Sequence, residues 1–321
     1  MARTQNTLAC AASSPSSAQG AAAEELRTGL SAPVPFISPK YLYDTLGSSL
    51  FTAITLLPEY YPTRCEAEIL REHAAEIARH AGRVESLIDL GAGDCAKAER
   101  LFPVLRPARY VPIDISAEYL QAAATRLRHA HPGVAVIALG RDFSQAFDLP
   151  PEIPAQDRLF FYPGSSIGNL APDEALALLA RIRDLCPGGG ILLGVDRVKP
   201  RAVLEPAYDD ALRLTAAFNL NLLRHVNTLL GSNFRVDDWR HAAHYNEAQS
   251  RIEMHLLARG DVTVKWPGGE RRFAAGQGIH TESSYKYTLP GFTDLLRRAG
   301  WRDIRHWSDR RDWFSVFSAR A

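Results

Sequence analysis

The chain has 321 residues, with 37 basic and 36 acidic side chains and a formal net charge of +1. A chain of this length can bury a substantial core, as one large domain or as two interleaved ones. The near balance of charge disfavours nucleic acid and membrane surfaces as partners, because neither meets an excess of basic side chains.

The opening run of the chain is rich in Ala, Ser and Gln and contains no continuous apolar segment. A signal peptide or a membrane anchor requires such a segment. We therefore expect residues 1–22 to form a disordered tail.

The cysteines are widely spaced, at Cys10, Cys65, Cys95 and Cys186, with no C-x-x-C pair. This pattern predicts a reducing, cytoplasmic location and no structural zinc site. His241 and His244 could face the same way on a helix, but no third ligand follows at helical spacing. We interpret both as packing or surface residues and expect no metal.

Residues 23–82 are expected to be helical, since apolar residues recur at intervals of three and four from about Ser38 to Gly82. Pro62 and the "GSS" at 47–49 are predicted to divide this stretch into short helices.

Between residues 83 and 196, short apolar runs alternate with segments of helical length. The runs lie in "SLIDL", "RYVPIDIS", "VAVIALGRDF", "RLFFYPGSSIGN" and "GGILLGVD". Such alternation is typical of an α/β protein with a parallel, doubly wound sheet.

Residues 197–286 have a different pattern. It predicts a long helix from Pro200 to Leu230, followed by strands joined by a turn at Pro267-Gly268-Gly269. The strands end in "HTESSYKYT" (280–288), whose alternation alone fits a solvated β face. Residues 287–321 predict one helix and two closing antiparallel strands.

A glycine loop, "DLGAGDC", follows the first predicted strand, so Gly91 and Gly93 could let the backbone approach a ligand closely. Asp114 ends the second strand, where a carboxylate can bind ribose hydroxyls, and Asp142-Phe143 ends the third, where they suit adenine. A nicotinamide dinucleotide and S-adenosylmethionine both fit these features, whereas an ordinary tight turn needs no ligand. The closing helix and antiparallel strand pair favour a class I methyltransferase.

The longer motifs are more specific. "KYLYDTLGSSLFTAITLLPEYYPTR", "DLGAGDCAK", "PGSSIGNL", "AYDDALRLTAAFNLNLL", "RIEMHLLAR" and "TESSYKY" occur in this order. On these motifs the chain resembles the histidine Nα-methyltransferases of ergothioneine biosynthesis, over roughly residues 38 to 317. The resemblance implies a class I methyltransferase Rossmann-like domain. It also implies a smaller α+β domain, made from the N-terminal helices and an insertion between strands five and six. We expect residues 23–82 and 197–286 to form the substrate domain and residues 83–196 and 287–321 to form the Rossmann-like domain.

The resemblance also assigns roles to residues of this chain. It implies that S-adenosylmethionine is bound by Gly91, Lys97, Asp114, Asp142 and Phe143, beside Gly93 of the same loop. It implies that the substrate is held by Asn169 and Tyr208 at its carboxylate, by Gly164 and Tyr43 near its amine, and by Tyr60, Glu282 and Ser284 at its imidazole.

The residues support these roles less specifically. Asn169 follows the fourth strand, at the edge where open α/β sheets bind ligands, although it could equally be a helix N-cap. Tyr43, Tyr60 and Tyr208 could be half-buried core aromatics. Glu282 and Ser284, two apart on a strand, project from one face.

We therefore expect a metal-free, monomeric enzyme that trimethylates the α-amino group of L-histidine to hercynine. "GDC" and "ESSY" depart from the usual residues of the family, but the Glu and the Ser are kept, which favours histidine over the tryptophan derivatives that related enzymes use. The alternatives are an NAD-dependent oxidoreductase and a non-catalytic S-adenosylmethionine sensor.

Overall fold

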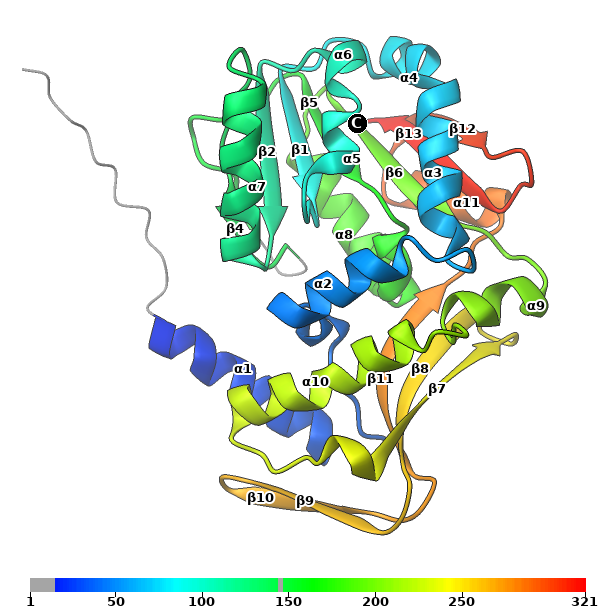
Figure 1. Ribbon diagram of the computed structural model, residues 1–321. Helices are drawn as coiled ribbons and strands as arrows, with labels where there is room; N and C mark the ends of the chain where they lie inside the picture. The colour runs from blue at the N-terminus through cyan, green and yellow to red at the C-terminus, as the bar shows by residue number, and fades with distance from the viewer. Residues whose placement is uncertain (1–14, 144–146) are drawn as a thin grey trace, which may run out of the picture.

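The computed structural model describes residues 15–143 and 147–321 (Figure 1). Eight described strands form the larger sheet. Its order is β12 (Arg302–Ser308), β13 (Phe314–Arg320), β6 (Gly190–Asp196), β5 (Arg158–Tyr162), β1 (Ser86–Leu90), β2 (Arg109–Asp114) and β3 (Ala135–Val136), with β4 (Leu139–Gly140) also paired to β2. β13 is antiparallel to both of its neighbours, while β1, β2, β3, β5 and β6 are parallel. The expected class I methyltransferase sheet, with its last strand inserted antiparallel, is confirmed.

Helices cover both faces of this sheet, and each face has its own hydrophobic core. One face packs against α8 (Pro172–Asp184) and α11 (Leu289–Arg298). The other packs against α3 (Tyr61–Glu72), α4 (Ala74–Ala81), α5 (Ala96–Glu99), α6 (Phe102–Leu105) and α7 (Ala117–Ala130). The strands are buried on both faces, which explains why they appear in the sequence as continuous apolar runs.

A second, antiparallel sheet is built from the segment between β6 and α11. It has the order β11 (Gly278–Tyr285), β8 (Arg251–Ala258) and β7 (Trp239–Asn246), and β9 (Val262–Trp266) and β10 (Gly269–Phe273) form a separate hairpin. α10 (Leu214–Leu230) packs on this sheet and contacts α1 (Pro15–Ser31), η1 (Pro39–Leu42) and α2 (Thr45–Ile54). α1, η1 and α2 therefore lie together with the insertion, as Figure 1 shows. α3 and α4, which were also expected in the substrate domain, pack on the larger sheet instead. The exact domain boundaries stay a prediction.

Three local expectations are wrong. Residues 200–230 do not form one helix: α9 (Arg201–Leu204) and η3 (Glu205–Ala207) end before α10 starts at Leu214. The Asp210 carboxylate accepts the N–H groups of Leu214 and Thr215 at 3.0 and 2.8 Å, so it caps a new helix there. Tyr208 lies in this break, and its hydroxyl reaches Ser284 of the second sheet.

The "GSS" at 47–49 does not break a helix, because it lies inside the first turns of α2, where the N-cap Asp44 accepts the Gly47 N–H at 2.7 Å. The expected tail over 1–22 overlaps α1, which starts at Pro15; residues 1–14 lie outside the described part.

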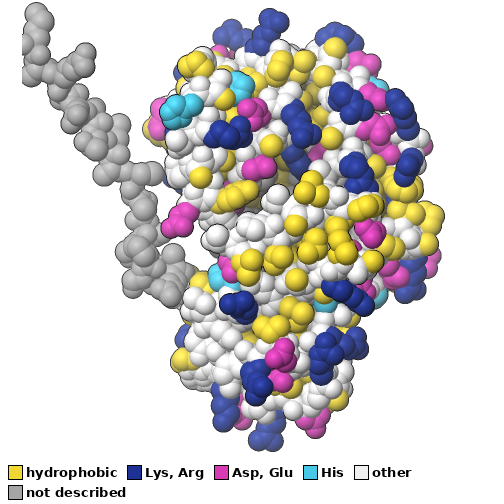
Figure 2. Space-filling view, viewed as in Figure 1, with side chains coloured by type: hydrophobic (Ala, Val, Ile, Leu, Met, Phe, Trp, Pro, Cys, Tyr) yellow, Lys and Arg dark blue, Asp and Glu magenta, His cyan; other side chains and the backbone are white. Residues whose placement is uncertain are grey.

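Within the described residues, we find no helix with the length and apolar character needed to cross a membrane. On the face in Figure 2, basic and acidic side chains are interspersed.

Candidate active site

The glycine loop after β1 is held to the end of β2 by one carboxylate. Gly91 and Gly93 have φ of 71° and 53°, in the left-handed region that favours glycine. Asp114 accepts the Gly93 N–H at 2.9 Å through one oxygen and the Ser116 N–H at 2.9 Å through the other. Each carboxylate oxygen keeps a further lone pair, so Asp114 can still accept ligand hydroxyls.

The loop leaves room beside its two glycines. A Cβ placed on Gly93 would meet no atom within 4 Å, and one on Gly91 would lie 3.8 Å from the Phe143 ring. An aromatic face, an open backbone and a half-buried carboxylate thus meet at the carboxyl edge of the sheet. Gly91, Gly93, Asp114 and Phe143 are the residues that would hold the cofactor there.

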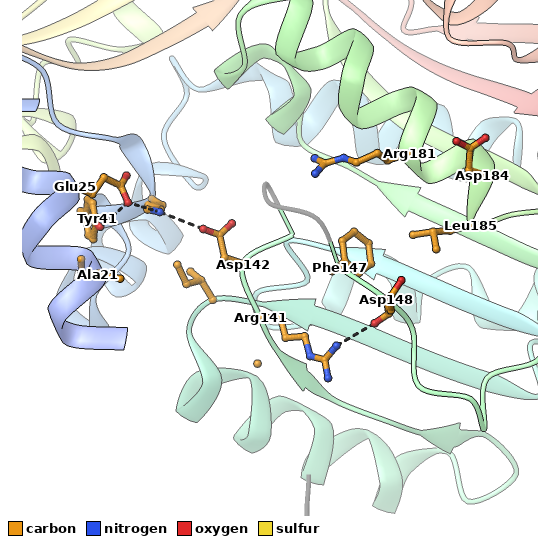
Figure 3. Close-up of a pocket in the computed structure, with 14 residues that line it drawn as sticks. Ala21, Glu25, Tyr41, Arg141, Asp142, Phe147, Asp148, Arg181, Asp184 and Leu185 are labelled. Atoms are coloured by element: carbon orange, nitrogen blue, oxygen red, sulfur yellow. Dashed lines mark hydrogen bonds and ion pairs between the residues drawn. The ribbon is translucent and has the colours of Figure 1, made fainter. Parts of the chain in front are cut away.

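Asp142 stands at the outer rim of this region, beside a cavity of about 900 Å³. Asp142 and Glu25 of α1 both form ion pairs with Lys40 Nζ, at 3.2 and 2.7 Å. Figure 3 shows Asp142 and Glu25 pointing toward each other. Of the expected site residues only Asp142 lines this cavity. The expected substrate residues lie elsewhere, around β11.

Lys97 and Gly164 meet at a buried carboxylate that was not predicted from the sequence. Glu66 of α3 is 1% exposed. One of its oxygens accepts the Gly164 N–H at 2.7 Å, and the other accepts from Lys97 Nζ at 2.7 Å. Gly194 on β6 makes room for it, because a Cβ there would collide with the Glu66 carboxylate. An acidic residue on the apolar side of an amphipathic helix, one turn before Ile69 and Leu70, was the signal that could have found it.

The loop after β5 lies in close contact with β11. A Cβ on Gly168 would lie 2.9 Å from the Tyr285 carbonyl oxygen, so glycine permits the close approach. Asn169, the next residue, is half-buried, and its side chain makes no hydrogen bond within the described chain. The N-cap of α8 is Ala171, so the alternative of Asn169 as a helix N-cap is wrong.

Glu282 is a buried carboxylate without a hydrogen-bond partner among the described residues. It is 7% exposed and pairs across the ladder with Met254 of β8. Burial raises the pKa of Glu282 to about 7, and the Lys286 ammonium opposes this rise. An acceptor of this kind is ready to receive an N–H donor from a ligand.

Ser284 and Tyr208 are joined by a buried lysine. Their hydroxyl oxygens lie 2.8 Å apart. Lys286 Nζ donates to Ser284 Oγ at 2.7 Å and to the Tyr208 hydroxyl at 2.9 Å, and it forms an ion pair with Asp196 at 2.7 Å. Burial alone would raise the pKa of Asp196, but Lys286 and Lys199 hold it below its ordinary value.

His241 fixes the backbone beside Tyr208. Its ring contacts Asn219 Nδ2 at 2.9 Å and the Tyr208 carbonyl oxygen at 2.8 Å. Asn219 Nδ2 can only donate, so His241 Nε2 carries the proton that is donated to the carbonyl. His241 and His244 both lie on the strand β7, three residues apart, so they face opposite sides of the sheet rather than one side of a helix.

Aromatic rings connect Tyr43 and Tyr60 to this group. The rings of Tyr43 and Phe51 have centroids 5.5 Å apart, those of Phe51 and Tyr60 5.9 Å, and those of Tyr60 and Tyr208 6.5 Å. Burial raises the pKa of Tyr43 well above its ordinary value, and the nearby Glu282 charge adds to this effect. One region is thus lined by Tyr43, Tyr60, Tyr208, Glu282 and Ser284. Phe51 packs between Tyr43 and Tyr60 beside it.

Comparison with known proteins identifies the chain. Residues 22–321 match the profile of the family described as "Histidine-specific methyltransferase, SAM-dependent". The chain belongs to this family. The resemblance seen in the motifs is therefore confirmed, and with it the dependence of the family on S-adenosylmethionine.

Curated members of the family align over nearly the whole chain. A histidine N-alpha-methyltransferase of Mycolicibacterium smegmatis is 40% identical over 300 residues, which is 91% of this chain and 92% of that protein. A histidine N-alpha-methyltransferase of Mycobacterium tuberculosis is 41% identical over 293 residues, 89% of this chain and 90% of that protein. Ergothioneine biosynthesis protein 1 of Neurospora crassa is 31% identical over 280 residues, 83% of this chain and 31% of that protein.

Proposed function

We propose that this methyltransferase transfers three methyl groups in succession from S-adenosylmethionine to the α-amino nitrogen of L-histidine, giving hercynine, a step of ergothioneine biosynthesis. The observation that carries the proposal is the buried, unpartnered carboxylate of Glu282, on the same strand face as Ser284. A ring with two polar nitrogens matches this pair, since Glu282 can accept an N–H and a serine hydroxyl can donate or accept.

Lys286 sets the hydrogen-bond directions of Ser284 and Tyr208. Its ammonium donates to both Ser284 and Tyr208, so each hydroxyl has one lone pair occupied. If Ser284 donates to Tyr208, the Tyr208 proton is free to point at the substrate carboxylate, while Ser284 retains a lone pair for an imidazole N–H. The unbonded amide of Asn169 would supply the second donor to the carboxylate.

The amine would lie between Gly164 and Tyr43. The Gly164 carbonyl can accept an amine N–H, and Glu66 holds the peptide from its N–H side. Because the raised pKa of Tyr43 keeps its phenol neutral, it serves as a hydrogen-bond partner and not as a phenolate base.

Each transfer forms an N–C bond as the methyl–sulfur bond of the sulfonium breaks and S-adenosylhomocysteine leaves. The amine loses a proton to water before the next transfer. The residues contribute mainly alignment, which can supply several kcal/mol or more. No described residue is needed as a covalent nucleophile.

An N-methyltransferase for a tryptophan derivative is the second candidate. An indole has one N–H and would leave either Glu282 or Ser284 without a ring partner, whereas a protonated imidazole ring offers an N–H to each, which favours histidine. We also propose that the protein is a cytoplasmic monomer; the buried Cys65, Cys95 and Cys186 are free thiols, which suits a reducing compartment.

Steady-state kinetics of Glu282→Ala with histidine and with tryptophan test the proposal. The variant leaves a buried ring N–H without an acceptor, which costs roughly 1 to 3 kcal/mol. We expect kcat/KM for histidine to fall about ten- to a hundredfold, the preference over tryptophan to shrink, and S-adenosylmethionine affinity to be retained. Wild-type kinetics for histidine would overturn the role of Glu282, and no methylation of histidine by the wild-type protein would overturn the function.

A further inference from the structure

A second cluster of polar side chains lies on β7 and β8, outside the methyl-transfer site. In the antiparallel register, His244 of β7 stands directly opposite Glu253 of β8, and His255 follows Glu253 by two residues on the same face. One ligand atom from each of the three lies within 4.8 Å of the other two. Glu253 Oε2 is 3.4 Å from His244 Nε2 and 3.9 Å from His255 Nε2.

The cluster is on the face of the sheet that points away from the proposed substrate pocket. Met254, the residue between Glu253 and His255, pairs with Glu282, whereas Glu253 pairs with Ser283. Since neighbouring residues of a strand face opposite sides, His244, Glu253 and His255 cannot reach the substrate. Changes to their side chains therefore leave the methyl-transfer residues in place.

Glu253 is held through one of its two oxygens. Its Oε1 accepts from Arg251 Nε at 2.8 Å and from Asn246 Nδ2 at 3.0 Å, and it pairs with Arg251 Nη2 at 2.7 Å. Its Oε2 faces the two imidazoles. A carboxylate oriented by outer hydrogen bonds on one oxygen, with the other directed at two histidines, is the arrangement seen around bound metal ions.

The distances suit a small divalent ion. Ligand bonds of about 2.0 to 2.1 Å in tetrahedral geometry place ligand atoms roughly 3.3 Å apart. The separations of 3.4 and 3.9 Å come near this value without an ion. The two imidazole rings are stacked, with centroids 5.3 Å apart, so one ring has to rotate for both nitrogens to face the same ion. Two imidazoles and one carboxylate are ligands preferred by Zn²⁺ and its neighbours rather than by Ca²⁺ or Mg²⁺.

Access and small neighbours also favour binding. The His244 side chain is 47% exposed, so an ion can enter from solvent and keep water in the remaining position. Ala242, directly opposite His255, carries only a methyl group. The guanidinium of Arg251 disfavours a cation and limits the affinity, so the ion is expected to be removable by chelation.

We propose that His244, Glu253 and His255 bind one divalent transition-metal ion of the Zn²⁺ class on the outer face of the three-stranded sheet. The ion links β7 to β8 and takes no part in methyl transfer. Its effect is to stabilise the insertion, because an ion that binds only the folded sheet shifts the folding equilibrium toward it.

The test uses the full-length protein without an affinity tag, treated with a chelator and then titrated with ZnCl₂ by calorimetry. We expect one equivalent to bind to the wild type and the thermal unfolding temperature to rise with added Zn²⁺. Both effects should disappear in His244→Ala and in His255→Ala. His129→Ala, at an exposed histidine of α7, is the matched control and should behave as the wild type.

Substitution of Co²⁺ gives a second readout, since a site with these ligands should produce visible absorption that is absent in the two variants. Methyl transfer and circular dichroism unchanged in both variants would show that they remain folded. If His255→Ala failed to fold, His244→Ala at its half-exposed position would still decide. No Zn²⁺ binding by the wild type, or equal binding by His244→Ala, would overturn the proposal.

Discussion

The Lys286 ammonium lies 2.7 Å from the Ser284 hydroxyl oxygen, two residues earlier in the chain. The same ammonium reaches Tyr208 and Asp196, so a single buried cation connects the end of β6 to two residues proposed to bind the substrate. Lys286 was not found from the sequence, although it lies within the motif "TESSYKY".

Lys286→Met should impair the use of histidine. Removing the ammonium leaves Ser284 and Tyr208 without the donor that orients their hydroxyls, with an expected loss of about 1 to 3 kcal/mol in kcat/KM. S-adenosylmethionine affinity, measured by calorimetry, should stay near that of the wild type.

Lys199→Met is the matched control for this change. Lys199 also pairs with Asp196 and donates to the Tyr61 hydroxyl at 2.9 Å, but no bond joins it to Ser284 or Tyr208. Both variants weaken a buried ion pair and should lower stability, whereas only Lys286→Met should raise the KM for histidine. Equal kinetic effects of the two would contradict a specific role for Lys286.

The raised pKa of Glu282 predicts that the stability of the protein depends on pH. Its pKa in the folded protein, about 7, is above the ordinary value of 4.5 for a glutamate side chain. Between these values the folded state holds a proton that the unfolded state has lost, so the contribution of Glu282 to stability falls as pH rises from about 4.5 to 7. The full penalty above pH 7 is on the order of 3 kcal/mol.

Glu282→Gln removes this titration. Urea unfolding of the unliganded protein should therefore show the variant gaining stability relative to the wild type at pH 8, compared with pH 5. Glu247→Gln, at an exposed glutamate, should show no such change. A difference between Glu282→Gln and the wild type that does not vary with pH would mean that Glu282 is ionised at both values.

Asp114→Ala should weaken S-adenosylmethionine. The variant removes both the carboxylate expected at the ribose and the acceptor for the Gly93 N–H. Loss of a charge-assisted hydrogen bond costs about 1.5 to 3 kcal/mol. Calorimetry on the variant, with the exposed Asp294→Ala as control, would refute the placement if cofactor affinity did not change.

Asn169→Ala should reduce the rate with histidine while cofactor binding persists, because the amine loses its alignment when the carboxylate is no longer clamped. Histamine, which lacks the carboxylate, supplies an independent check. We expect it to be a much poorer substrate than histidine for the wild type and to be little affected by the substitution. Comparable use of histidine and histamine by the wild type would contradict the clamp.

The sequence predicted the Rossmann-like sheet and its closing strands well, because strands buried on both faces appear as continuous apolar runs between helical segments. It failed at 200–230, where apolar spacing continues through a break that Asp210 creates by capping. Local periodicity cannot reveal such a cap when the apolar spacing of a helix continues past it.

The site residues, too, were predicted only in part. Glu282, Ser284 and Tyr208 were found by resemblance, and the structure places them in one region, while their roles stay proposals. Glu66 and Lys286 were missed because their partners, Gly164 and Tyr208, are 98 and 78 residues away in the chain. A buried charge can be explained only once folding has supplied its partner.

NMR of the reaction product tests the central claim most directly. The protein is incubated with histidine and S-adenosylmethionine whose methyl group is isotopically labelled, and the labelled carbons are located in the product. We expect three equivalent labelled methyl groups on the α-nitrogen and none on the imidazole ring. Label on a ring nitrogen, a final product with fewer methyl groups, or unmodified histidine would contradict the proposed function.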